Sequence, residues 1–298
     1  MKALVVGDVI DDILVTPSTP IRTNTDTHAR IKQSPGGSAA NFACWLGSIS
    51  KKTDTVEFVG RVNQEDLARH QKVLEHFNVT PHLQADKDLA TGSIVVLVEG
   101  ADRSFLTDRG ANQNLDISAI PDELFGDLVY ISGYSLLSLG EKDIKTLISR
   151  AHKLGAKVAC DPGSAGFIQD FGIKRFLDAL SGTDIFLPNL EEGRILTGED
   201  RPEIITAILN ERFRLVALTM GSDGCAVRAR PEQPSKEAFY LQLAAPTAES
   251  VDPTGAGDAF AAAFLNSFTT TGSPEAAAKA GIRLGAIAVT LNGGRPRG

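Results

Sequence analysis

The sequence predicts a doubly wound α/β domain, in which a mainly parallel sheet lies between helices. Short apolar runs alternate with helix-length amphipathic segments along most of the 298 residues, and turn residues separate them. Hydrophobic residues make up 42% of the chain and charged residues 22%, which is typical of a globular protein. Because no internal repeat or low-complexity linker interrupts the chain, we expect residues 1–298 to form a single domain.

Each expected strand is a short run of β-branched or apolar residues that ends in a turn signal. In chain order, the runs are ALVV at the start, VEFVG near 58, DLVYISG near 130, KVACDP near 160, DIFLPN near 186 and RLVALTMG near 217. The expected helices lie at 61–78, 141–154, 170–181, 191–197, 202–212 and 257–271. The helix at 141–154 has a period near 3.6 and stops at Gly155. This alternation predicts βαβ units and hence parallel strands.

Two segments interrupt the alternation. Residues 13–34 and 91–107 are rich in threonine, valine and isoleucine, which predicts strands of a separate small sheet. Two strand-like runs also meet at residues 99–102, which favours a hairpin there. We therefore expect an antiparallel flap, or lid, inserted into the domain over the edge of the main sheet.

The composition excludes several classes of protein. A formal net charge of −7 repels polyanions, so we expect no nucleic-acid partner. The start, MKALVVGDVIDDIL, is too short and too charged for a signal peptide, and no stretch is long enough to span a membrane. The three cysteines and five histidines show no CxxC or HExxH spacing. We expect reduced thiols, no zinc site and a cytoplasmic protein.

Residues 250–265, SVDPTGAGDAFAAAFL, combine a glycine turn with the start of an alanine-rich helix. The backbone N–H groups of Gly255, Ala256 and Gly257 would converge near the positive end of the helix dipole and form an anion hole. A carboxylate at Asp258 would repel a phosphoryl group, so a positioned base explains it better than a plain phosphate-binding loop. From this segment alone, Asp258 could equally complement the helix dipole.

Two motifs resemble the signatures of the ribokinase-like, or PfkB, carbohydrate kinases. DPTGAGDAFAAAFL resembles the second signature of that family, and PGGSAANFACWL, residues 35–46, resembles the first. Two ordered signatures roughly 200 residues apart rarely arise by chance. The resemblance covers essentially the whole chain. It implies a ribokinase-like fold with a β-sheet lid, and transfer of the γ-phosphoryl group of ATP to a primary hydroxyl of a small sugar, with Asp258 as the base.

The resemblance also implies a substrate site around the first signature. Gly36 and Gly37 would let the substrate approach the backbone, and Asn41 would bind its hydroxyls, although a local helix cap at Asn41 is the alternative. Asp12 matches the aspartate that grips sugar hydroxyls in the family. In the run DRGAN, Asn112 is a further candidate contact.

One residue of the expected substrate site departs from the family pattern, and other charged residues lie near that site in the sequence. Ser38 stands where ribokinases proper tend to carry lysine, which argues against ribose. Asp8 and Asp11 are alternatives to Asp12, and some of the three are expected to be solvated loop charges. Four arginines of the lid region could reach an acidic sugar or could simply face solvent: Arg22, Arg30, Arg103 and Arg109.

On the nucleotide side, Asn189 and Glu192 resemble the family's NxxE element, in which Glu192 would act on Mg²⁺ through water. A capped helix start is the alternative for this pair. Thr219, Gly221 and Gly224 resemble the loop that lines ATP, and a plain hairpin turn is the alternative there.

Two further expectations rest on the resemblance. Asp252 matches a position that binds a monovalent cation in some members, so K⁺ is a candidate ligand. In relatives the lid often closes over the substrate and forms a dimer clasp, which predicts a homodimer.

Rival functions lack their motifs. The chain has no GxGxxG after its first strand, no GxxxxGK[ST] and no GxSxG, which argues against an NAD-dependent oxidoreductase, a P-loop NTPase and a serine hydrolase. A non-catalytic binding relative would be expected to lose Asp258 and the glycine turn. Aromatic residues are only 6% of the chain, which favours a free sugar over a nucleoside such as adenosine, cytidine or pseudouridine; the nucleoside stays the runner-up.

Overall fold

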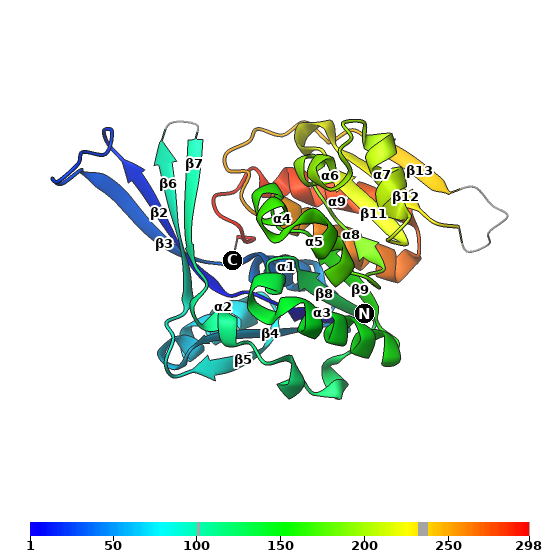
Figure 1. Cartoon of the computed structure of the whole chain (residues 1–298), viewed down its shortest axis with the longest axis horizontal. Helices are drawn as coiled ribbons and strands as arrows, with labels where there is room; N and C mark the ends of the chain where they lie inside the picture. The colour runs from blue at the N-terminus through cyan, green and yellow to red at the C-terminus, as the bar shows by residue number, and fades with distance from the viewer. Residues whose placement is uncertain (100–101, 232–237, 298) are drawn as a thin grey trace.

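The computed structural model describes residues 1–99, 102–231 and 238–297, and it places their strands in one large and one small sheet (Figure 1). The large sheet contains β1 (Lys2–Val6), β4 (Thr55–Asn63), β5 (Thr80–Asp86), β8 (Leu128–Ser132), β9 (Lys157–Asp161), β10 (Ile185–Phe186), β11 (Leu215–Thr219), β12 (Cys225–Ala229) and β13 (Phe239–Leu243). Its order is β13-β12-β11-β10-β9-β8-β1-β4-β5. The strands from β11 to β5 pair in parallel, whereas β12 and β13 pair antiparallel.

Helices cover both faces of this sheet. They are α1 (Ser38–Ile49), α2 (Leu67–His76), α3 (Ser135–Lys153), α4 (Ala165–Phe171), α5 (Ile173–Ala179), α6 (Leu190–Thr197), α7 (Pro202–Asn210), α8 (Ala256–Thr271) and α9 (Pro274–Ala288). Short 3₁₀ turns lie at Gln64–Asp66, Gly110–Asn114, Ile117–Ala119, Asp122–Leu124 and Gly221–Asp223. Successive side chains of a strand point to opposite faces, so Leu4 joins the core under α3 to α7, and Val5 joins the core under α1, α2, α8 and α9. The predicted doubly wound fold is confirmed.

Several predicted boundaries are wrong for local reasons. Residues 61–63 continue β4, so the helix expected at 61–78 begins only at Leu67. The helix expected at 170–181 is instead the pair α4 and α5, because Gly172 adopts a φ of 93° between them. Helix α3 begins at Ser135, ahead of the expected 141, and Gly140 breaks its regular conformation with a φ of 74°.

The lid is a separate four-stranded sheet that projects from the body of the molecule (Figure 1). It consists of β2 (Ile10–Pro17), β3 (Ala29–Gly36), β6 (Gly92–Glu99) and β7 (Asp102–Asp108), in the order β3-β2-β6-β7. Its two outer pairings are antiparallel, but the central pair β2–β6 is parallel, so the expectation of a purely antiparallel flap is wrong. Both central strands run outward from the main sheet, which forces them to be parallel. A hairpin was expected at residues 99–102, and its turn, at residues 100 and 101, lies outside the described residues.

The root of the lid is fastened by Asn112. Its Oδ1 accepts a hydrogen bond from Val9 N, and its Nδ2 donates to Val9 O and Arg109 O, all at 2.9 Å. The side chain is only 2% exposed, so these bonds replace water entirely. We expected Asn112 to contact the substrate, but both N–H groups of its amide donate to backbone carbonyls. These bonds join the end of the lid to the connection between β1 and β2.

No helix among the described residues is long and apolar enough to cross a membrane. All three cysteines are buried free thiols. The buried state of Cys44, which raises its pKa to about 11, makes this thiol a poor nucleophile.

We expect Asn112→Ala to lower the free energy of unfolding by roughly 2–4 kcal/mol, because it leaves a buried N–H and C=O of Val9 without partners. Urea denaturation measures this loss. The control is Gln113→Ala, at the exposed next residue of the same 3₁₀ turn, where we expect a change within about 0.5 kcal/mol. Equal losses in the two variants would contradict the role of Asn112 as a clamp.

Candidate active site

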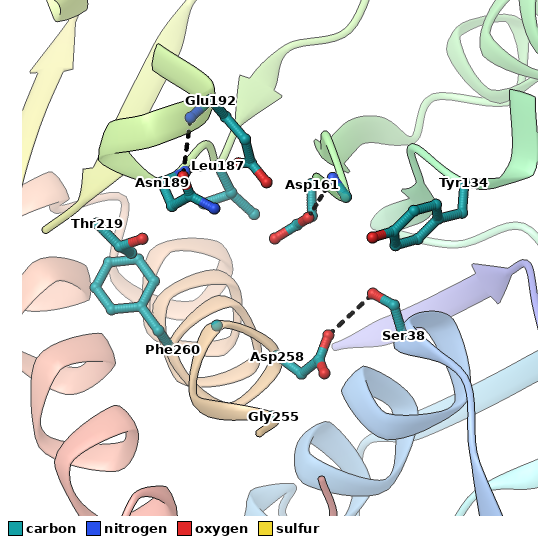
Figure 2. A pocket seen from close by; sticks show the side chains of 12 residues that line it. Ser38, Tyr134, Asp161, Leu187, Asn189, Glu192, Thr219, Gly255, Asp258 and Phe260 are labelled. Atoms are coloured by element: carbon teal, nitrogen blue, oxygen red, sulfur yellow. Dashed lines mark hydrogen bonds between the residues drawn. The ribbon is translucent and has the colours of Figure 1, made fainter. Parts of the chain in front are cut away.

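A cavity of about 210 Å³ lies where β9, β10 and β11 end, next to the start of α8 (Figure 2). One water occupies roughly 30 Å³ of liquid, so this space suits a ligand rather than a single ion. Asp161 ends β9, Leu187 follows β10 and Thr219 ends β11, and all three line the cavity. Ligands of open α/β sheets bind at this carboxyl edge.

The glycine turn before α8 forms one wall of the cavity. Gly255 has a φ of 78°, in the left-handed region, and a Cβ there would lie 2.4 Å from the carbonyl oxygen of Gly294. Ala256 N donates to Pro253 O at 3.2 Å, so this member of the expected anion hole has a partner already. Among the described residues, the N–H groups of Gly255, Gly257 and Asp258 have no such partner. These three N–H groups are the donors available to an anion.

Asp258 lies in the first turn of α8 and points into the cavity opposite Ser38 (Figure 2). Ser38 Oγ donates to Asp258 Oδ1 at 3.1 Å. Loss of solvent around the carboxyl, followed by the nearby negative charge of Asp161, raises the pKa of Asp258 well above its ordinary value. A carboxylate with a raised pKa is a better proton acceptor than an exposed one.

Asp161 was missed in the sequence analysis. Its Oδ1 accepts a hydrogen bond from Gly163 N at 2.9 Å, and burial raises its pKa to about 6. Asp161 is the last residue of a buried parallel strand, whereas Asp12 is the third residue of the lid strand β2. The rule that ligands bind at strand ends could therefore have identified Asp161.

Asn189 and Glu192 form a reciprocal cap at the start of α6. Asn189 Oδ1 accepts from Glu192 N at 2.9 Å, and Glu192 Oε2 accepts from Asn189 N at 2.7 Å. Burial and the charge of Asp161 raise the pKa of Glu192 to about 8. The cap that appeared to be an alternative to a functional role in fact aims both side chains into the cavity (Figure 2).

These carboxylates fit Mg²⁺ only in a partly hydrated form. No group of three or more histidine, cysteine or acidic side chains that could hold a metal is found among the described residues. Mg²⁺ usually keeps several waters and binds one or two carboxylates together with phosphates. Glu192 and Asp161 match that requirement.

Of the three aspartates that follow β1, two have fixed partners. Asp8 accepts hydrogen bonds from the backbone N–H groups of Ser38 at 3.0 Å and Ala39 at 3.2 Å, and so caps α1. Asp11 forms an ion pair with Arg69 at 2.6 Å. Neither carboxylate is free for a ligand.

Asp12 has no hydrogen bond within the described residues, although burial raises its pKa to about 6. Its carboxyl lies against Gly36, where a Cβ would be 2.2 Å from Oδ2. At Gly37 the φ is 93° and a Cβ would lie 2.6 Å from Asp8 O. The glycine pair therefore serves close packing as well as access to the backbone, and it leaves Asp12 as the carboxylate available to a substrate.

An arginine that the sequence analysis did not identify lies beside this glycine pair. Arg295 Nε donates to Asn41 Oδ1 at 2.9 Å, and its Nη2 donates to Gly36 O at 2.8 Å. Trp45 Nε1 donates to Gly294 O at 2.9 Å and fixes the tail segment against α1. Figure 1 shows the red C-terminal segment running between the lid and α1. Because residues 41 and 295 are so far apart in sequence, no local pattern could have indicated this contact.

The two glycines that were expected to line ATP, Gly221 and Gly224, form a turn in the structure. Thr219 lines the cavity, but Gly221 and Gly224 belong to the turn between β11 and β12. A Cβ at Gly224 would lie 1.9 Å from Leu243 O, so the adjacent β13 requires a glycine there. The hairpin considered as an alternative is what the chain forms at this point.

Asp252 is engaged by three neighbours. Its Oδ1 accepts from Thr254 Oγ1 at 2.7 Å and from Arg103 Nη1 at 3.2 Å, and its Oδ2 accepts from Gly293 N at 3.0 Å. Burial alone would raise the pKa of this carboxyl, but the hydrogen bonds outweigh burial, and the pKa is lowered. Since Arg103 lies on β7, the lid is joined to the turn that precedes the anion hole.

The other three lid arginines have different surroundings. Arg22 bonds the backbone of Asp26 within its own loop, and Arg30 is exposed. The guanidinium of Arg109 lies 4.8 Å from the ring centroid of Tyr134, a residue that lines the cavity.

The chain was compared with known proteins. The family model described as pfkB family carbohydrate kinase matches residues 1–296. The chain is 28% identical to an ATP-dependent ribose-1-phosphate kinase of Halopiger xanaduensis, over 89% of this chain and 83% of that protein. It is 26% identical to a fructokinase of Escherichia coli (98% and 94%) and to an adenosine kinase of Schizophyllum commune (85% and 78%).

The fold has solved counterparts. A putative ribokinase II from E. coli, in complex with ATP and Mg²⁺, superposes with a TM-score of 0.80 at 21% identity, over 98% of this chain and 94% of that one. This likeness confirms the ribokinase-like arrangement of main sheet and lid.

We expect Glu192→Gln to stabilise the ligand-free protein at pH 8 but hardly at pH 5. The folded-state pKa is raised, so the native state binds more protons than the unfolded state between the two pKa values, and stability falls as pH rises toward 8. Glutamine keeps an acceptor for Asn189 N and removes the charge. The expected gain at pH 8 is on the order of 2 kcal/mol in free energy of unfolding, measured by urea denaturation without Mg²⁺.

The matched control is Glu191→Gln, at the exposed neighbour in the same helical turn. It should change stability little at either pH. A Glu192→Gln curve that runs parallel to wild type from pH 5 to pH 8 would contradict a raised pKa at this position.

Proposed function

Because this chain belongs to the pfkB family of carbohydrate kinases, we propose that it transfers the γ-phosphoryl group of ATP to a primary hydroxyl of a small sugar. One observation carries the proposal: the Asp258 carboxyl meets, at one cavity, the N–H groups of Gly255 and Gly257, which have no backbone partner in the described part of the chain. A proton acceptor beside anion-binding donors is what in-line phosphoryl transfer requires.

In the proposed mechanism, Asp258 accepts the proton of the attacking sugar hydroxyl. The hydrogen bond from Ser38 orients the carboxylate, and the raised pKa makes it a stronger acceptor. The N–H groups at the start of α8 hold the negative charge of the transferred group, and the helix dipole adds to their effect. The charge on the transferred phosphoryl oxygens is thus met by fixed dipoles.

The remaining residues divide between the two substrates. The sugar would be bound by Asp12, Asn41 and the backbone of Gly36 and Gly37. Its attacking hydroxyl would then lie near Asp258, which Ser38 contacts. Asn189 and Thr219 would contact the ATP phosphates. Glu192 and Asp161 would hold Mg²⁺ through water, and this ion, when bound, neutralises phosphate charge.

A nucleoside acceptor is the second candidate, supported by the similarity to an adenosine kinase. Tyr134 lines the cavity and its hydroxyl points inward, so a base could contact this phenol. ATP turnover with ribose, fructose, 2-keto-3-deoxygluconate, adenosine, cytidine and pseudouridine separates the two classes.

We propose that K⁺ binds at Asp252 by replacing Arg103, because that guanidinium already contacts the carboxylate. Turnover in KCl against NaCl at equal ionic strength decides this point. The buried, unpaired thiols support the further proposal that the protein works in the reducing cytoplasm.

Asp258→Asn should keep the fold and sugar binding but lower kcat by at least about 10²–10⁴, because the amide cannot accept the proton. Turnover is measured by ADP release, and binding is measured by calorimetry. Asp170→Asn, an exposed carboxylate on α4, is the control and should keep full activity. Near-normal kcat in Asp258→Asn would exclude it as the base.

We also propose that the lid mediates a homodimer. Ile31 on β3 and Leu106 on β7 share one face of the lid by register, and Phe105 lies on the other face. All three are 63–64% exposed, which is unusual for large apolar side chains on one small sheet. Sedimentation should give a dimer for wild type and a monomer for the double variant Phe105→Ser, Leu106→Ser. A wild-type monomer at micromolar concentration, or a dimer that survives the double substitution, would contradict the lid interface.

A further inference from the structure

The hydrogen-bonding character of the sugar site is altered by Arg295. The atoms around a hydroxyl-binding site of this kind are largely acceptors: Gly36 O, Asn41 Oδ1 and the carboxylate of Asp12. Two of these acceptors already receive hydrogen bonds from Arg295, at 2.8 and 2.9 Å. What remains for a ligand near the guanidinium is the donor capacity of the guanidinium itself, since the Asn41 side chain also hydrogen-bonds Asp258.

The third nitrogen of the guanidinium has no partner. Arg295 Nη1 is buried and makes no hydrogen bond within the described residues. An arginine that served only to tie down the tail would complete its hydrogen bonds with protein or leave the free nitrogen in water. A buried N–H of a charged group that has no partner is unfavourable. The tail also has an independent anchor in the bond from Trp45 to Gly294 O.

A second arginine packs on Tyr134, a residue of the cavity wall. The guanidinium of Arg109 has no ion pair or side-chain hydrogen bond in the part of the chain that the structure describes, and it stacks over Tyr134 at the cavity wall. Stacking leaves the edge N–H groups of a guanidinium available. The acidic chain therefore keeps two arginines with unused donors, Arg295 beside the Gly36–Gly37 pair and Arg109 on Tyr134.

We propose that the acceptor sugar carries an anionic group, a phosphate or a carboxylate, and that Arg295 binds this group. Planar guanidinium groups recognise both oxyanions through charge-assisted hydrogen bonds, and an oxyanion supplies only acceptors, as the site requires. Asp12 lies near the charge of Arg295 but makes no hydrogen bond within the described residues, so it remains for a hydroxyl of the same sugar. The inference rests on the proposed kinase function and specifies its substrate class.

The experiment compares matched neutral and charged ligands on the full-length protein. Calorimetry without ATP measures binding of ribose against ribose 1-phosphate, and of fructose against 2-keto-3-deoxygluconate; the first pair reports on phosphate and the second on carboxylate. We expect one charged ligand to bind at least about tenfold more tightly than its neutral counterpart. In Arg295→Gln this preference should fall to about threefold or less, while Arg295→Lys should keep part of it.

Arg297→Gln is the matched control, because it removes the same charge from an exposed position two residues further along the tail. It should keep the wild-type preference. Equal or tighter binding of the neutral ligands by wild type would overturn the inference, and so would an equal weakening of neutral and charged ligands by Arg295→Gln. If Arg295→Gln does not fold, the relative affinity of the wild-type protein for charged and neutral ligands still tests the inference.

Turnover with ATP separates this inference from the proposed function. Phosphorylation of neutral sugars alone would overturn the anionic substrate and keep the kinase. Arg295-dependent binding of a charged sugar, without any transfer from ATP, would keep the inference about the ligand and overturn the proposed function.

Discussion

The arrangement of the site depends on one close contact, between Gly255 at the start of α8 and Gly294 in the C-terminal segment. No side chain fits between these residues, since a Cβ on Gly255 would lie 2.4 Å from the Gly294 carbonyl oxygen. The same carbonyl accepts the indole N–H of Trp45 on α1. The start of α8, the second half of α1 and the tail are therefore held at one point. Asp258, Asn41 and Arg295 each lie within a few residues of it, and their relative positions follow from it.

Electrostatics around this point favour function over stability. Asp161, Glu192 and Asp258 share one cavity, and each has a raised pKa because burial and its neighbours disfavour the charged form. A fold selected only for stability would replace at least one of them. Perturbed carboxyl groups gathered in a cleft are typical of sites that bind cations and transfer protons.

The sequence was sufficient for features that depend on neighbours along the chain. The buried strands, α6 with its cap, and the glycine turn before Asp258 are local patterns, and the structure has them where they were expected. Long-range features were not accessible in this way. The contact of Arg295 with Asn41, the parallel pairing of β2 with β6 and the clamp at Asn112 each join residues that are distant in sequence, and periodicity carries no information about such pairs. Asp161 is intermediate, since it ends a buried strand and the rule that ligands bind at the carboxyl ends of strands could have identified it.

The bond between Arg295 and Asn41 joins residues 254 positions apart, which has a kinetic consequence. Closing so long a loop is entropically unfavourable until most of the intervening chain is ordered, so we expect the sugar site to form late in folding. Partly folded forms with an intact parallel sheet would then lack the site altogether. A ligand held there would slow the first step of global unfolding, and it would protect the protein from proteolysis as a whole rather than loop by loop.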